Sequence, residues 1–149
     1  NFEYIRDLNL PSFNIKYNNY DNDTETILKT SIDLLLKTYI RSNKNEYLEI
    51  LNLKEKFDSR HKLKDKVSKL DFIQIIQDLA NRFYSIDLYL PSLNLYKESL
   101  KLKIRSKKNN DSIIETMNKI MQIYVIIKQY DKAKVIYLNA IELKKNNLF

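Results

Sequence analysis

The sequence contains no cysteine, no tryptophan and no glycine, and it has only two prolines and one histidine. Without cysteine, the 149-residue chain can form neither disulfides nor thiolate metal sites. Without glycine, it lacks Gly-rich phosphate loops and the residue that most easily adopts the positive φ of tight hairpins. The composition therefore favours helices joined by polar turns.

Long hydrophobic runs are also missing. The chain is 44% hydrophobic and 30% charged, which is too apolar for a disordered protein. Its longest apolar runs, such as residues 123–127, are far shorter than the roughly 20 residues that cross a bilayer. We therefore expect no membrane insertion. The absence of a secretory signal pattern and of cysteine leads us to expect a cytoplasmic protein.

The formal net charge is +7, but the composition explains much of it. Asn, Lys, Ile and Tyr are abundant, as is typical of an AT-rich eukaryotic genome. Most lysines fall in expected turns and helix ends, such as Lys107, Lys108, Lys144 and Lys145. We interpret the charge as solvated surface charge, and nucleic-acid binding is the less favoured alternative.

Residues suited to catalysis are scarce. His61 is the only histidine, and it lies in the charged stretch 59–62. A nucleophile–base pair or a histidine-based metal site therefore has little to be built from. The carboxylates of Asp21 and Asp23 resemble helix-start residues. We predict that the chain is not an enzyme and that it binds no cofactor and no metal.

Two stretches of the chain match each other at a spacing of 41 residues. Aromatic residues fall on aromatic residues, and small residues on small ones. The matched positions are Phe83, Tyr89, Ser92, Tyr96 and Ser99 with Tyr124, Tyr130, Ala133, Tyr137 and Ala140. A repeated unit of this length points to a helical-repeat architecture.

Each unit has the pattern of two helices. In the last unit, residues 112–145, Ser112 and Glu115 form a capping-box pattern before an apolar helical stripe, and Tyr130 opens the second helix. In the middle unit, residues 71–106, Asp71 with Gln74 offers the first helix start. Pro91 lies where the first turn of the second helix is expected.

The rest of the chain is less regular. Residues 24–57 match the repeat only in part, and 58–70 are expected to be a charged linker or helical extension. Residues 1–23 are assigned only as an irregular N-terminal segment. Most tyrosines at repeat spacing are expected to pack in the core, with Tyr84 pointing into a groove instead. These tyrosines are Tyr39, Tyr84, Tyr96, Tyr124, Tyr130 and Tyr137.

The segments 120–124 and 129–134, followed by Tyr137 and Ala140, resemble a tetratricopeptide repeat. The common repeat of that family has 34 residues, and a period of 41 is similar to the longer variety of kinesin light chains. The resemblance is most specific over 112–143. It departs at Met121, which replaces the small residue that Ala80 supplies in the middle unit. Because Met is bulky, the helices there are expected to sit further apart or to meet something different.

The resemblance implies an all-α fold, a right-handed α-solenoid of antiparallel helix pairs. It also implies a scaffold that binds a partner peptide or helix on a concave wall formed by the first helix of each unit. A helical wheel places polar residues of each unit on that wall. They are Gln74, Gln77, Asn81 and Tyr84; Glu115, Asn118, Gln122 and Val125; and Asp33, Lys37 and Arg41.

The resemblance singles out Gln77 and Asn118, because asparagine on the first helix binds peptide backbone in kinesin-light-chain repeats. A side-chain amide both donates and accepts hydrogen bonds, so it can pair with an extended peptide. The alternative is that these amides are simply solvated. Two other functions stay open: an RNA-binding helical repeat, and a structural module that forms a homodimer through the uncapped terminal helix around 135–143.

Overall fold

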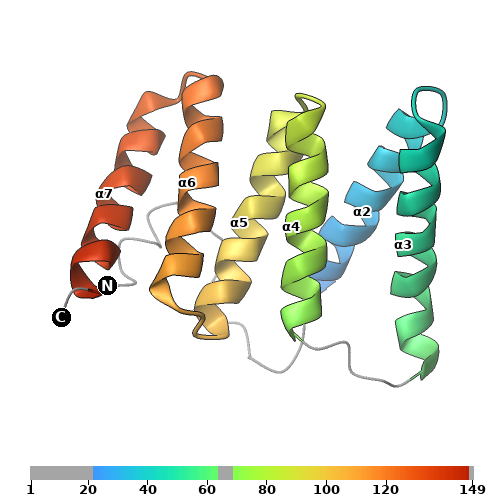
Figure 1. Cartoon of the computed structure of the whole chain (residues 1–149), viewed down its shortest axis with the longest axis horizontal. Helices are drawn as coiled ribbons and strands as arrows, with labels where there is room; N and C mark the ends of the chain where they lie inside the picture. The colour runs from blue at the N-terminus through green and yellow to red at the C-terminus, as the bar shows by residue number, and fades with distance from the viewer. Residues whose placement is uncertain (1–21, 64–68, 148–149) are drawn as a thin grey trace.

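The computed structural model describes residues 22–63 and 69–147, and these residues are almost entirely helical (Figure 1). Six α-helices are present in this part of the chain. They are α2 (Asn22–Tyr39), α3 (Lys44–Leu63), α4 (Lys69–Ser85), α5 (Tyr89–Arg105), α6 (Asn110–Ile126) and α7 (Tyr130–Asn147). The all-α prediction is confirmed. No helix in the described ranges is long and apolar enough to cross a membrane.

The segment boundaries differ in detail from those expected. Residues 22 and 23 belong to α2, and residues 1–21 of the expected irregular segment lie outside the described residues. In the segment 58–70, α3 continues to Leu63 and α4 begins at Lys69.

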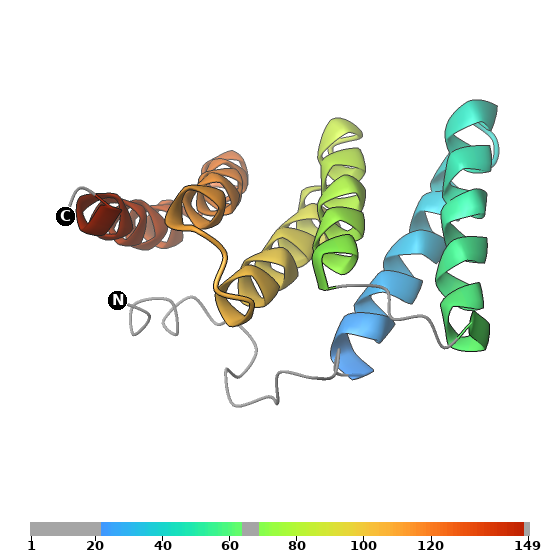
Figure 2. The same ribbon diagram turned by 60° about the horizontal axis from the view of Figure 1, so that its bottom comes forward.

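The helix bounds repeat with the spacing found in the sequence. Lys69 and Asn110, which begin α4 and α6, are 41 residues apart, and so are Tyr89 and Tyr130, which begin α5 and α7. Consecutive helices pair, α4 with α5 and α6 with α7, and the two pairs make equally extensive contacts (Figures 1 and 2). Met121 is half-buried against the core without reducing that contact.

Helices α4, α5 and α6 end in the same way although the chain has no glycine. A residue with positive φ follows each of them: Asp87 (63°), Lys107 (55°) and Lys128 (64°). After α5, the N–H of Lys107 donates to Ile104 O at 3.1 Å and that of Lys108 to Lys103 O at 3.0 Å. This is the Schellman pattern, which satisfies the free carbonyls of a helix end. Ordinary side chains thus occupy positions that glycine usually fills.

Two predicted helix starts are wrong. Asn109 caps α6, because its side-chain oxygen accepts the N–H of Ser112 at 2.8 Å. Ser112 therefore lies inside the first turn and does not open the helix. Helix α4 begins at Lys69, so Asp71 also lies inside a first turn. Pro91 is confirmed in the first turn of α5, where the proline nitrogen needs no hydrogen-bond partner.

The buried faces follow the predicted apolar stripes, except at two tyrosines of α7. Leu79, Ala80 and Phe83 of α4 are fully buried. The side chains of α6 and α7 that continue this core are Met117, Ile120, Ile123, Tyr124, Ala133, Ile136, Ala140 and Leu143. Tyr130 and Tyr137 of α7 are exposed, so the prediction that they pack in the core is wrong.

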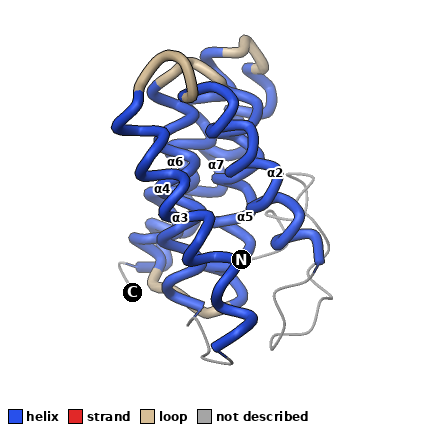
Figure 3. Tube along the Cα trace, turned by 90° about the vertical axis from the view of Figure 1, so that its right-hand side faces the viewer, coloured by secondary structure: helices blue, strands red, loops and turns tan. Residues whose placement is uncertain are grey.

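The first helix pair sits differently from the other two. Helix α2 packs against α3 and also lies against α4 and α5, and the Thr24 hydroxyl donates to the Glu98 carboxylate of α5. Seen along the row of pairs, α3 lies on the side of α4 and α6, whereas α2 lies on the side of α5 and α7 (Figure 3). The expected wall of α2, α4 and α6 therefore has α3 in place of α2.

Candidate partner-binding surface

The predicted wall residues of α4 and α6 form two equivalent rows. Gln74, Gln77, Asn81 and Tyr84 are each 41 residues before a wall residue of α6. Gln74 and Asn81 are exposed, and Gln77 and Tyr84 are half-buried. All four counterparts on α6 are exposed: Glu115, Asn118, Gln122 and Val125. The α6 row is thus fully at the surface, and the α4 row is partly covered.

The side-chain amides in these rows differ in whether they form hydrogen bonds within the chain. The Gln74 amide donates to Asp78 Oδ1 at 3.1 Å on the same helix, and Asn81 Oδ1 accepts the Tyr96 hydroxyl. Within the described ranges, Gln77, Asn118 and Gln122 form no side-chain hydrogen bond. Their donors and acceptors are therefore available to a partner.

Tyr84 has a structural role that the sequence did not indicate. Its ring packs edge-on against Tyr89, with 5.6 Å between the centroids, and the Lys119 ammonium of α6 lies 5.5 Å from the Tyr84 centroid. A cation over an aromatic face is attracted by the ring quadrupole. Tyr84 thus joins α4 to α5 and α6, which explains why it is half-buried and does not stand free in a groove.

A cavity of about 530 Å³ lies where the α2–α3 turn and the start of α3 face the C-terminal half of α4. Asn81 lines it, so one predicted wall residue reaches this cavity. The other lining residues are Tyr39, Asn43, Glu46, Asp78, Arg82, Ser85 and Ile86. Polar groups from three helices thus surround one hollow.

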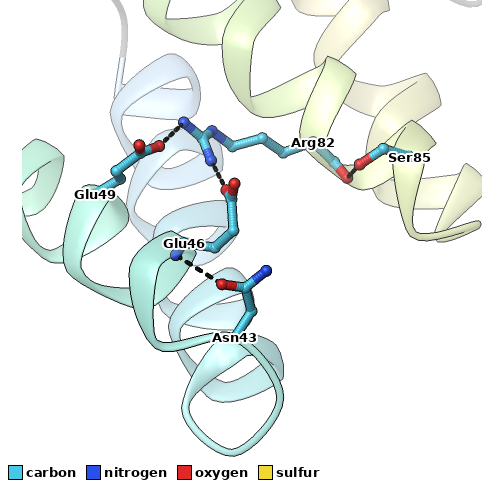
Figure 4. Close-up of polar contacts among 5 residues, drawn as sticks. All are labelled: Asn43, Glu46, Glu49, Arg82 and Ser85. Carbon is cyan, nitrogen blue, oxygen red and sulfur yellow. Dashed lines mark hydrogen bonds and ion pairs between the residues drawn. The ribbon is translucent and has the colours of Figure 1, made fainter.

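Arg82 is the centre of this cavity's polar network (Figure 4). Its guanidinium donates to Glu46 and also to Glu49 Oε2 at 2.7 Å, so it ties α4 to the first two turns of α3. Asn43 caps α3, since its side-chain oxygen accepts the Glu46 N–H at 3.2 Å. At the other end of the helix, Phe57 packs edge-on against Phe72 of α4, with 6.2 Å between centroids.

The charges of the cavity are negative on balance. Burial lowers the pKa of Arg82, but the hydrogen bond to Glu49 and the charge of Glu46 outweigh it, so this pKa is raised and Arg82 stays cationic. Burial and the nearby Glu46 carboxylate also raise the pKa of Tyr39. Because Arg82 faces two carboxylates, and Asp78 adds a third, the cavity suits a hydrogen-bond donor or a basic group.

The structure does not bring Lys37 and Arg41 to the other wall residues. Both are exposed, and they line a separate cavity of about 420 Å³ with Leu36, Ile40 and Tyr47. Asp33 is exposed and pairs with Lys54 of α3 at 3.5 Å. The cause is the placement of α2, which lies against α4 and α5 and leaves α3 beside the wall.

Sequence reasoning missed Glu46, Glu49 and Arg82. The i, i+3 spacing of the two glutamates on α3 was the available signal, because residues three apart share a helix face. No group of three or more His, Asp or Glu residues that could hold a metal occurs in the described ranges, and the side chain of His61 lies outside them. Comparison with protein-family models, with curated proteins and with solved structures finds no match.

Proposed function

We propose that this chain is a protein-binding scaffold of tetratricopeptide-like helix pairs, stacked as an α-solenoid, and that it holds an extended peptide or a helix along α4 and α6. The observation that carries the proposal is a pair of matching amides, one half-buried on α4 and one exposed on α6. Gln77 and Asn118 occupy equivalent positions 41 residues apart, and neither amide has a hydrogen-bond partner in the described part of the chain.

Two equivalent amides on neighbouring helices suit an extended ligand. Each can donate to one peptide carbonyl and accept from one peptide N–H, so recognition would not depend on the ligand's side chains. Specificity would come from the cavity beside Arg82, where Glu46 and Asp78 favour a basic or hydrogen-bonding side chain. Asn81 belongs to the α4 row and also lines the cavity, so one ligand could contact both.

The proposal can be tested by selecting peptides from a random library on the wild-type chain and measuring their affinity by fluorescence anisotropy. The variant Gln77→Ala/Asn118→Ala removes both amides and should weaken binding about thirtyfold, since losing two hydrogen bonds of about 1 kcal/mol each costs about 2 kcal/mol of binding free energy. The matched control is Asn94→Ala/Gln129→Ala, which removes two exposed amides outside the rows and should bind normally.

Equal affinity of both double variants would show that the amide rows do not form the site. An Arg82→Met variant separates the cavity from the rows, because it should change which peptides are selected rather than abolish binding. The RNA alternative predicts a different outcome. RNA would bind with an affinity that falls steeply with salt, because phosphate contacts release counterions.

A further inference from the structure

The turn between α2 and α3 contributes to two cavities of opposite charge that share no lining residue. The cavity beside Arg82 is negative on balance. The second cavity, of about 420 Å³, has two basic side chains and three mainly apolar ones, and no carboxylate lines it. Its lining residues are Leu36, Lys37, Ile40, Arg41 and Tyr47. The proposed function does not use this second cavity.

The two cations of the second cavity have no carboxylate partner. Lys37 belongs to the last turn of α2 and Arg41 to the turn that follows, and both side chains are exposed. Within the described ranges, neither side chain forms an ion pair or a hydrogen bond. Two uncompensated positive charges therefore line one hollow.

The carboxylates closest in sequence to this cavity are bound to other cations. Asp33 precedes Lys37 by one helical turn, but it pairs with Lys54 at 3.5 Å. Glu46 is next to Tyr47 in the sequence, but it binds the guanidinium of Arg82 on α4. A carboxylate from another molecule would therefore meet the two cations without competition from these side chains.

We infer that this second cavity binds an acidic segment of a partner protein that carries an apolar side chain among its carboxylates. Charge complementarity sets the first requirement, because Lys37 and Arg41 attract carboxylates and a guanidinium can bind one with two hydrogen bonds. The apolar lining sets the second requirement, since Ile40 is 59% exposed and covering it removes apolar surface from water.

The lining also favours a peptide over other anions. A nucleic acid is held mainly through its phosphates and would leave the apolar part of the lining uncovered. A lipid surface is flat, whereas a single side chain can enter a cavity of this size. The site lies on α2 and α3, so the inference does not depend on the amide rows of α4 and α6.

The probe is a fluorescein-labelled peptide with one phenylalanine flanked on both sides by glutamates, titrated with the intact chain in fluorescence anisotropy at low ionic strength. Lys37→Gln/Arg41→Gln should weaken binding about tenfold, because it removes both charge contacts. The matched control is Lys134→Gln/Lys145→Gln, which removes two exposed cations of α7 and lowers the net charge equally. It should leave the affinity within about twofold.

A second pair of variants tests the apolar lining. Ile40→Asn should weaken binding about threefold, because it removes part of the wall that the phenylalanine covers. Leu48→Asn is the control, since Leu48 is 50% exposed and does not line this cavity, and it should bind normally. A probe with serine in place of phenylalanine should lose affinity with the wild type and should not distinguish Ile40→Asn from it.

Four results would overturn the inference. The first is no binding of the probe, which is also expected if residues outside the described ranges fill the cavity. The second is an equal loss in both double lysine and arginine variants, because net charge alone would then attract the probe. The third is equal affinity for the phenylalanine and serine probes. The fourth is binding of anionic lipid vesicles, but not of the probe, that Lys37→Gln/Arg41→Gln abolishes. Circular dichroism checks that each variant is folded.

Discussion

Helices α5 and α7 follow the same sequence pattern but have different surroundings. Both pack against the preceding helix of their own pair, and α5 is also in contact with α6 and α2. Tyr96 of α5 is buried and donates its hydroxyl to Asn81, whereas Tyr137 of α7 is exposed. In a helical repeat, the pattern of a helix tells which residues can pack, and the neighbouring pair decides which of them do.

The same comparison explains the buried charges of α5. Glu98 and Lys101 form an ion pair of 2.9 Å with both side chains almost fully buried. The counterparts on α7 are the buried Asn139 and the exposed Glu142. Charges taken out of water must be paired, because an isolated buried charge is very costly. The helix enclosed by several neighbours therefore carries paired charges, and the terminal helix of the described residues does not.

The largest expected effect comes from truncating the two equivalent tyrosines. Tyr96→Ala should lower the free energy of unfolding by about 3–5 kcal/mol, because it leaves a cavity between packed helices. Tyr137→Ala should lower it by less than about 1 kcal/mol, because that side chain is half in water already. Urea unfolding followed by circular dichroism measures both. Equal losses would mean that the two pairs pack alike.

Breaking the buried ion pair of Glu98 and Lys101 should lower the free energy of unfolding somewhat less than Tyr96→Ala does. Lys101→Met leaves the Glu98 carboxylate without this partner, and we expect a loss of about 3 kcal/mol in the free energy of unfolding. Glu142→Met at the equivalent position of α7 should change stability by no more than about 0.5 kcal/mol, since the site is exposed. A larger loss in the free energy of unfolding for Glu142→Met than for Lys101→Met, in the same urea experiment, would contradict this difference between α5 and α7.

Alkaline pH should weaken the middle pair selectively. Burial raises the pKa of Tyr96 to about 12, above the value of about 10 expected in the unfolded chain. The stability that depends on the neutral phenol is thus fully present below pH 10 and is lost as the pH rises toward 12, by about 2 kcal/mol in all. Tyr96→Phe should flatten this part of the stability–pH curve, and an equally steep curve in that variant would contradict the assignment to Tyr96.

The smallest effect concerns the turns inside the two pairs. Lys128→Gly relieves a side chain held at positive φ and should raise the free energy of unfolding by up to about 1 kcal/mol. The equivalent Asp87→Gly should gain less, because it also removes the hydrogen bond from the Tyr89 hydroxyl to Asp87, which is 2.8 Å long. A larger gain at Asp87 would show that this hydrogen bond contributes nothing.

Much of the helical architecture could be predicted from the sequence. The spacing between Tyr96 and Tyr137 is the same as that between the helices that carry them, because a repeated stripe needs a repeated helix to bury it. The surface position of Asn118 followed from the same periodicity. The start of α6 did not, since Ser112 and Asn109 are both good caps and only the backbone geometry selects Asn109.

The arrangement of the first pair could not be predicted. Residues 24–57 match the repeat only in part, and a helix pattern does not specify which neighbour each face meets. The Arg82 network depends on bringing α3 beside α4, which are joined by contacts between residues more than 30 positions apart in the sequence. The burial of Lys101 and Lys103 could not be predicted either, because it depends on the helices that surround α5 and not on the pattern of α5 alone.

The most direct test of the proposed protein-binding role is to map a selected peptide on the isotope-labelled chain by NMR chemical-shift perturbation. The account predicts that the largest shifts cluster on α4 and α6, around Gln77 and Asn118, and that they extend to Asn81 at the cavity. Shifts confined to α2, or spread evenly over all the described helices, would contradict it.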